Sequence, residues 1–255
     1  MKPSDIAPAR PSSTVVLVRD NDDGPEVFLV RRHKASSYGG AYVFPGGVID
    51  PPDKLITDRC VDISPDAANQ RLRLGEEGAC YYSAAIRELF EESGVLLADH
   101  AMSAAELEKN RIELNAGKIR WDELVVGNKL TLKCSELRYF SHWITPDVYP
   151  KRYTTRFFLT AMPEDQYACH DNCELTGEVW ISPAAALGAA ADGELPLHFP
   201  TIKTIEQLAG LDSMSQILDW AADCERAGVE AIHPVMPSGT ARGEPGVWRT
   251  PRELL

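Results

Sequence analysis

The alternation of apolar and polar residues predicts several β-strands in this chain. Residues 14–18 and 26–31 are rich in valine and other strand-forming residues, and the Asn-Asp-Asp-Gly sequence at 21–24 has the composition of a hairpin turn. Similar patterns predict later strands at 136–144, 152–160 and 175–181, with a last short strand at 229–235.

The stretch 83–97 carries the clearest helix signal. Glu88, Glu91 and Glu92 fall within about 100° of one another on a helical wheel, and Gly94 stands where the helix would end. The opposite arc is apolar and contains Tyr82, Ile86, Leu89, Phe90 and Ser93. We therefore expect a helix that buries one face against a sheet and exposes three carboxylates.

Further helices are predicted on both sides of this stretch. Ser103 can cap a helix over 103–115, and Ser182-Pro183 begins an alanine-rich helix. Other helical patterns cover 121–126, 199–210 and 213–226. The order of strands and helices predicts an α/β protein, with an α/β/α sandwich around a mixed sheet.

Two stretches combine residues that suit phosphate chemistry. Three carboxylates on one helix face repel each other, and Mg²⁺ and Mn²⁺ prefer such oxygen-rich clusters, so Glu88, Glu91 and Glu92 are candidate metal ligands. The alternative is a solvated acidic face. About forty residues upstream, Gly46 and Gly47 follow Phe44-Pro45 and make a tight turn whose free N–H groups can lie against a phosphate chain.

Together the two stretches resemble the Nudix box, Gly-x5-Glu-x7-Arg-Glu-x-x-Glu-Glu-x-Gly-apolar, of nucleoside-diphosphate-X hydrolases. The matching positions are Gly47, Arg87, Glu88, Glu91, Glu92, Gly94 and Val95. The resemblance implies a metal-dependent hydrolase with Mg²⁺ or Mn²⁺ on Glu88, Glu91 and Glu92. It implies that Arg87 braces these carboxylates and that Glu91 and Glu92 act in catalysis. A further base outside the box is expected at Glu174 or, less favoured, at Glu178.

The match departs from the signature between its two halves. In an uninterrupted box the arginine would stand at residue 61, fourteen positions after Gly47, whereas it stands at 87, so 26 residues are inserted. We assign 51–78 to this insertion and expect a surface excursion with a short helix near 67–74. The early Glu of the box falls on Asp53 or on Ala79, depending on the side counted from, and Asp53, Glu76 or Glu77 could take its place.

Within the Nudix proteins the chain is similar to the coenzyme A diphosphatase-like group, whose box carries a long insertion. Besides the box, the similarity rests on Ile-Thr-Pro-x4-Lys-Arg-Tyr-x2-Arg-Phe-Phe-Leu from residue 144. It implies cleavage of coenzyme A or an acyl-CoA to 3′,5′-ADP and a 4′-phosphopantetheine product. The extra 3′-phosphate needs cationic partners, for which we expect Arg31, Arg152 and Arg156, beside Gly46 and Gly47 for the diphosphate.

Two alternatives stay open. In the fuller coenzyme A signature Arg32 stands where a serine is expected and Ser36 where a second arginine is expected. ADP-ribose, NADH or another dinucleotide is therefore an alternative substrate. The alternative of another class is a catalytically silent Nudix-fold ligand sensor, which the intact glutamate set argues against.

Composition limits the partners. The 255 residues are 44% hydrophobic, enough for one domain over 13–235, with a helical extension at 198–227 and loose termini at 1–12 and 236–255. A net charge of −12 argues against nucleic acid and membrane partners but not against a metal-bound phosphate substrate. Without a predicted signal peptide or membrane span, and with six cysteines lacking a regular framework, we expect a cytoplasmic protein. The family resemblance leaves a homodimer open.

Overall fold

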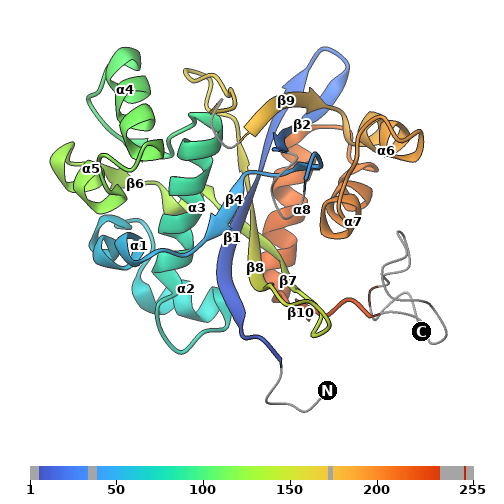
Figure 1. The fold of residues 1–255 in the computed structure, drawn as a ribbon, viewed down its shortest axis with the longest axis horizontal. Helices are drawn as coiled ribbons and strands as arrows, with labels where there is room; N and C mark the ends of the chain where they lie inside the picture. Colours follow the sequence, from blue (N-terminus) through green and yellow to red (C-terminus); the bar gives the residue numbers. More distant parts are fainter. Residues whose placement is uncertain (1–5, 34–38, 172–174, 236–249, 251–255) are drawn as a thin grey trace.

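A mixed β-sheet forms the middle layer of the fold (Figure 1). The computed structural model describes residues 6–33, 39–171, 175–235 and 250, and within them this sheet has eight strands. Its main path is β10-β7-β8-β1-β2-β3, with β4 paired to β1 and β9 to β2. The strands are β1 (Ala9–Asn21), β2 (Gly24–Arg32), β3 (Tyr42–Val43), β4 (Gly46–Val48), β7 (Arg138–Ile144), β8 (Arg152–Ala161), β9 (Leu175–Ile181) and β10 (Ala231–Ile232).

Helices cover both faces of this sheet, so the predicted α/β/α sandwich is confirmed (Figure 1). One side carries α1 (Pro51–Leu55), α2 (Pro65–Leu72), α3 (Gly78–Ser93), α4 (Ala104–Asn115) and α5 (Trp121–Gly127), with the small ladder β5 (Ala98–Asp99)–β6 (Thr131–Leu132). The other side carries α6 (Pro183–Ala191), α7 (Phe199–Leu208) and α8 (Met214–Ala227). Short 3₁₀ turns lie at Thr57–Arg59 and Cys134–Glu136.

The long apolar runs of β1 and β2 follow from this layering. The two strands form the predicted hairpin, with Asn21 opposite Gly24. Successive residues point to opposite faces, so Val15 and Leu17 enter the core under α3, whereas Val16 and Val18 enter the core under α7 and α8. The sequence of a strand that is buried on both faces is continuously hydrophobic instead of alternating between apolar and polar residues.

The N-terminal boundary differs from the prediction. Residues 1–12 were expected to be loose, but β1 begins at Ala9 and pairs in parallel with β8 from Arg152 onward. The prolines in this stretch predicted a loop, because proline is uncommon inside strands. Pro11 nevertheless lies within the ladder, in register with Thr154. At the other end the predicted strand at 229–235 is shortened to β10, and the predicted loose tail at 236–255 lies, apart from Thr250, outside the described residues.

The insertion is part of the core, so the expected surface excursion is wrong. It folds into α1, a 3₁₀ turn and α2, and its buried residues join the cluster around α3: Asp53, Ile56, Cys60, Ile63, Ala68 and Leu72. Its large buried apolar residues are Ile56, Ile63 and Leu72, and the small side chains of Cys60 and Ala68 fill the space between helices. The described helices include none that is long and apolar enough to cross a membrane.

Candidate active site

Helix α3 and strand β4 meet so closely that only glycine fits between them. A Cβ atom on Gly47 would lie 2.4 Å from Glu88 Oε1, and one on Gly46 would lie 2.4 Å from the Ser13 carbonyl oxygen. Both distances are shorter than real contacts, so another residue at Gly46 would push the turn away from the β1 backbone, whereas one at Gly47 would displace the Glu88 carboxylate. The paired glycines therefore let β4 pack closely on β1 and α3, and the Gly46 N–H donates to the Glu92 carboxylate rather than being free as the sequence predicted.

Arg87 is the hub of the site. Its side chain is 6% exposed, and its Nε and Nη2 atoms donate to the Asp53 carboxylate, with Nη2 to Oδ2 at 2.9 Å. Its Nη1 atom donates to Glu88 Oε1 at 2.8 Å and to Glu91 Oε2 at 2.9 Å, and Nη2 also donates to the Val48 carbonyl. Arg87 thus holds two of the three predicted metal ligands and ties them to α1 and β4.

Asp53 occupies the place of the early Glu in the box. It is fully buried, accepts from Arg87 and Ser83, and caps α1 by accepting from the Asp50 N–H. Glu77, one of the alternatives, instead forms an exposed ion pair with Lys54. These contacts favour the count from the glycine side.

Glu92 is held differently from its two neighbours. It is 5% exposed, its Oε2 accepts from the Gly46 N–H at 3.0 Å, and its Oε1 pairs with Arg32 Nη2 at 2.9 Å. Arg32 also donates to the Gly46 carbonyl. The expectation that Glu92 lies on an exposed face of α3 is wrong, because β4 and the end of β2 cover that face.

Burial shapes the electrostatics of these carboxylates. Burial raises the pKa of Glu88, although the positive charge of Arg87 acts to lower it. Burial also raises the pKa of Glu91 to about 8. The charge of Arg87 again acts to lower this pKa, and the charge of Glu88 acts to raise it. Burial alone would lower the pKa of Arg87, but the charge of Glu88 and the bonds to Asp53 outweigh it and raise that pKa. Ionised carboxylates here need a cation.

The donor set fits a hard divalent cation. Carboxylate oxygens are the ligands that Mg²⁺ and Mn²⁺ prefer, and a bound cation would stabilise the ionised forms of Glu88 and Glu91, whose pKa values burial raises. Within the described residues, however, no three acidic, histidine or cysteine side chains already converge as ligands. Arg87 engages Glu88 Oε1 and Glu91 Oε2, and Arg32 engages Glu92 Oε1, so a cation would bind beside these arginines through the other carboxylate oxygens.

The expected substrate-binding arginines are spread over the fold. Arg31 Nε donates to the Gly40 carbonyl at 3.3 Å at the end of β2, next to Arg32. Arg152 donates to the Thr145 and Ala7 carbonyls and pairs with Asp147, so it closes its own loop. Arg156 is 4% exposed, and its guanidinium stacks on Tyr81 near the N-terminal end of α3. Of the three, only Arg31 is next in sequence to a residue that contacts the carboxylates, and its own guanidinium lies near the Tyr42 ring, on the opposite face of β2.

The expected base Glu174 lies outside the described residues. Glu178, the less favoured candidate, lies on β9 and accepts from the backbone N–H of His170, and its Oε2 lies 2.9 Å from His170 Nδ1. Sequence reasoning missed this pair, and it missed the contact between Arg32 and Glu92. Neither pair has a local signal, because the chain separates their members by 8 and 60 residues and only the fold joins them.

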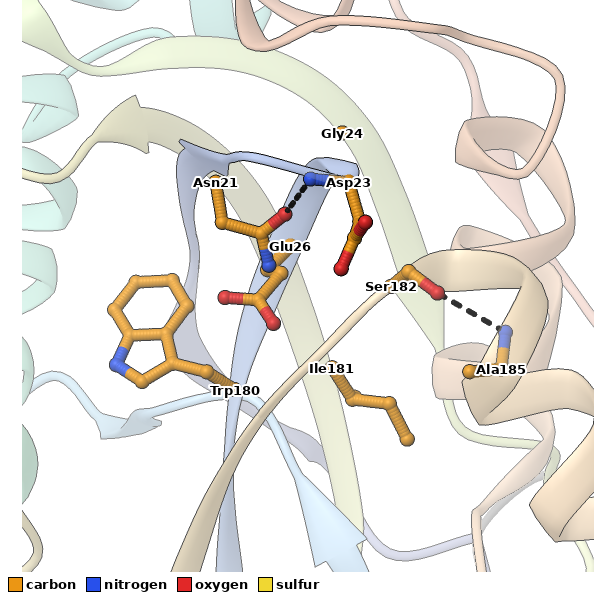
Figure 2. Close-up of a pocket in the computed structure, with 8 residues that line it drawn as sticks. All are labelled: Asn21, Asp23, Gly24, Glu26, Trp180, Ile181, Ser182 and Ala185. Carbon is orange, nitrogen blue, oxygen red and sulfur yellow. Dashed lines mark hydrogen bonds between the residues drawn. The ribbon is translucent and has the colours of Figure 1, made fainter.

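A recess of about 260 Å³ lies elsewhere, where the β1–β2 hairpin meets β9 and the start of α6. Figure 2 shows Trp180 on one side of it and the carboxylates of Asp23 and Glu26 turned toward it. None of its lining residues belongs to the carboxylate cluster or to the predicted site. Chemistry rather than volume therefore identifies the candidate active site.

Comparison with known proteins agrees with this geometry. The NUDT19 Nudix domain family matches residues 65–208, more than half of the 255-residue chain. The protein named putative nudix hydrolase 7 of Caenorhabditis elegans is 28% identical over 211 residues, which cover 83% of this chain and 62% of that protein. Human acyl-coenzyme A diphosphatase NUDT19 is 25% identical over 257 residues, covering 84% of this chain and 68% of its own.

A solved structure shows the same fold. The crystal structure of a NUDIX hydrolase from Alicyclobacillus acidocaldarius superposes with a TM-score of 0.65 at 25% identity, over 84% of this chain and 96% of that one. The predicted resemblance to Nudix hydrolases is thereby confirmed, together with the fold. The chain belongs to the NUDT19 Nudix domain family of Nudix hydrolases.

Proposed function

We propose that the chain is a Mg²⁺- or Mn²⁺-dependent diphosphatase that cleaves coenzyme A or an acyl-CoA to 3′,5′-ADP and a 4′-phosphopantetheine product. The observation that carries this proposal is the Arg87 hub, which holds Glu88 and Glu91 together beside Gly47 and is itself fixed by Asp53. A sensor that binds without cleaving has no need for such a brace. The name of the human relative, acyl-coenzyme A diphosphatase, supports the substrate class.

The residues divide the work as follows. Glu88, Glu91 and Glu92 would hold the cation, which neutralises the charge of the diphosphate when bound. Arg87 sets the separation of Glu88 and Glu91 and keeps their orientation fixed through Asp53. Gly46 and Gly47 let β4 pack against β1 and Glu88, and their backbone is the proposed contact for the diphosphate.

The acid–base group is proposed to be the His170–Glu178 pair. Because Nδ1 of His170 faces Glu178, Nε2 is the atom left to accept a proton from the attacking water. That water forms a new bond to one phosphorus while the bridging P–O bond breaks, and the diphosphate yields two monophosphates. The proposed Glu174 stays a further candidate for the same role.

Recognition of the 3′-phosphate is assigned to Arg31 rather than to Arg152 or Arg156. Arg31 has one weak hydrogen bond, whereas Arg152 is tied to two carbonyls and Asp147, and Arg156 is buried under α2. Arginine binds phosphate through two parallel hydrogen bonds, so its loss should weaken binding of the 3′-phosphorylated compound selectively. The cytoplasmic location and the homodimer stay predictions.

The test is a product-resolved screen of coenzyme A, acetyl-CoA, 3′-dephospho-coenzyme A, ADP-ribose and NADH, with Mg²⁺ and with Mn²⁺. We expect coenzyme A or its thioester to have the highest kcat/KM. Arg31→Ala should raise KM for coenzyme A about tenfold, the equivalent of about 1.4 kcal/mol, and leave the dephospho compound unchanged. Arg19→Ala is the matched control, because Arg19 lies on the same hairpin but pairs with Glu26. Preferred cleavage of ADP-ribose or NADH would refute the assignment of coenzyme A as the substrate but would leave the assignment as a diphosphate hydrolase intact.

A further inference from the structure

One buried arginine outside the Nudix box connects the end of α3 to the loop after β8. Arg111 of α4 is 3% exposed. Its Nε atom donates to the Glu91 carbonyl at 3.0 Å, and its Nη2 atom donates to the Cys169 carbonyl at 2.7 Å. Its Nη1 atom lies 3.4 Å from Cys169 Sγ. A single guanidinium thus bridges the backbone of a candidate metal ligand and the residue before His170.

The loop is attached to α3 at further points. The Cys169 N–H donates to the Ser93 carbonyl at 2.9 Å, and the Gln166 side chain forms hydrogen bonds with both the N–H and the carbonyl of Leu96. His170 follows at once and contacts Glu178. The segment 166–171 is therefore held against the C-terminal end of α3 and the residues that follow it.

The register of the sheet places Glu178, the partner of His170, on the same face as Arg32. Glu178 stands opposite Val30 on β2, two residues before Arg32, which pairs with Glu92. Paired residues share a face of the sheet, so Glu178 and Arg32 lie on the α3 side. Because His170 lies in the loop, its position relative to Glu91 and Glu92 depends on how the loop is held against α3.

A simpler role for Arg111 is to cap the helix. A cation beside the last carbonyls of a helix stabilises it, but Asn115 already donates to the same Glu91 carbonyl at 3.1 Å. Asn115 has no contact of this kind with the loop among the described hydrogen bonds, whereas Arg111 uses the other side of its planar fork to hold Cys169. The second contact is what helix capping does not explain.

We propose that Arg111 is a positioning residue that fixes the loop 166–171, and with it His170, relative to Glu91 at the end of α3. The effect of Arg111 on the reaction rate rests on the proposed function, because it is measured on the diphosphatase reaction. Its structural consequence does not, because the attachment of the loop can be measured without substrate.

The experiment compares Arg111→Met with Asn115→Ala. Both variants remove a donor to Glu91, but only Arg111→Met also removes a contact to the loop, the hydrogen bond to the Cys169 carbonyl. We expect Arg111→Met to lower kcat about 10- to 100-fold with the Mg²⁺ dependence of the rate unchanged, as misplacement of a supporting residue does. Hydrogen exchange followed by mass spectrometry should be faster at the Cys169 amide. Asn115→Ala should keep both the rate and the exchange of the wild type.

Each outcome decides the proposal. Equal losses in the two variants, or wild-type exchange in Arg111→Met, would overturn it. Should Arg111→Met not fold, Arg111→Lys answers the same question, because its single ammonium keeps the charge but cannot reach both carbonyls. Faster exchange in that variant supports the proposal, and wild-type exchange refutes it. If the wild-type protein cleaved no diphosphate, the proposed function would fail while the exchange comparison still tested the loop attachment.

Discussion

At the scale of single residues, the site depends on charges that are satisfied within the protein. Arg87 is surrounded by three carboxylates, and the one that is fully buried, Asp53, belongs to the inserted segment. A buried ion pair adds little net stability, but losing one member leaves an uncompensated charge. Asp53 therefore supports both the fold and the geometry of Glu88 and Glu91.

Asp53→Asn should destabilise the protein and slow the reaction. The amide keeps the volume but loses the charge opposite Arg87, so we expect a loss near the lower end of about 3–5 kcal/mol, because Glu88 and Glu91 still face Arg87. We expect kcat to fall about 10- to 100-fold. Urea unfolding and steady-state kinetics measure the two effects.

Glu77→Gln is the control for this prediction. Glu77 was an alternative for the same role, but its pair with Lys54 is exposed and should contribute no more than about 1 kcal/mol. If Glu77→Gln reduced activity as much as Asp53→Asn, the assignment of the early Glu position to Asp53 would fail.

At the scale of elements, the sequence predicted most of the fold. The β1–β2 hairpin, α3, α4 and the helices α6 to α8 carry local signals, namely turn residues, caps and apolar periodicity. Three features could not be predicted: the burial of Glu92, the packing of the insertion and the Arg111 contacts. Each depends on residues that are distant in the chain, and Cys60 and Ala68 are too small to produce a recognisable apolar period.

The insertion provides a test of this difference. Replacing residues 58–72 with a short Gly/Ser linker would remove Cys60, Ile63, Ala68 and Leu72 from the core around α3. It would also remove Asp62, which accepts from the Cys134 and Ser135 N–H groups. We expect the loss of the cooperative thermal transition in circular dichroism, because a single buried leucine already contributes about 2–5 kcal/mol.

A matched variant changes only the surface of the insertion. Asp58, Asp66 and Gln70 are exposed, and replacing all three with serine should leave Tm almost unchanged. A linker variant that melts cooperatively near the wild-type temperature would show that the segment is dispensable after all.

At the scale of the whole molecule, stability and catalysis meet in the carboxylates of α3. The helix packs against the sheet on one side and against α1, α2 and α4 on the others, so its charges lie inside the folded unit. Ionising them in the folded protein costs free energy that the unfolded chain does not spend. The free energy of unfolding should therefore depend jointly on pH and on divalent cations.

The sign follows from Glu91. Its pKa is raised by burial from 4.5 to about 8 in the folded protein, so between these values the folded state holds a proton that the unfolded state has lost. Without metal, stability should fall as pH rises through this window and level off above about 8. Mg²⁺ competes with the proton and offsets the repulsion, so the rise in Tm on adding Mg²⁺ should be larger at high pH than at low pH. Thermal melts at pH 6 and pH 9 measure this, and Glu91→Gln should flatten the metal-free pH dependence. An equal Mg²⁺ effect at both pH values would contradict the assignment of Glu91 as a metal ligand.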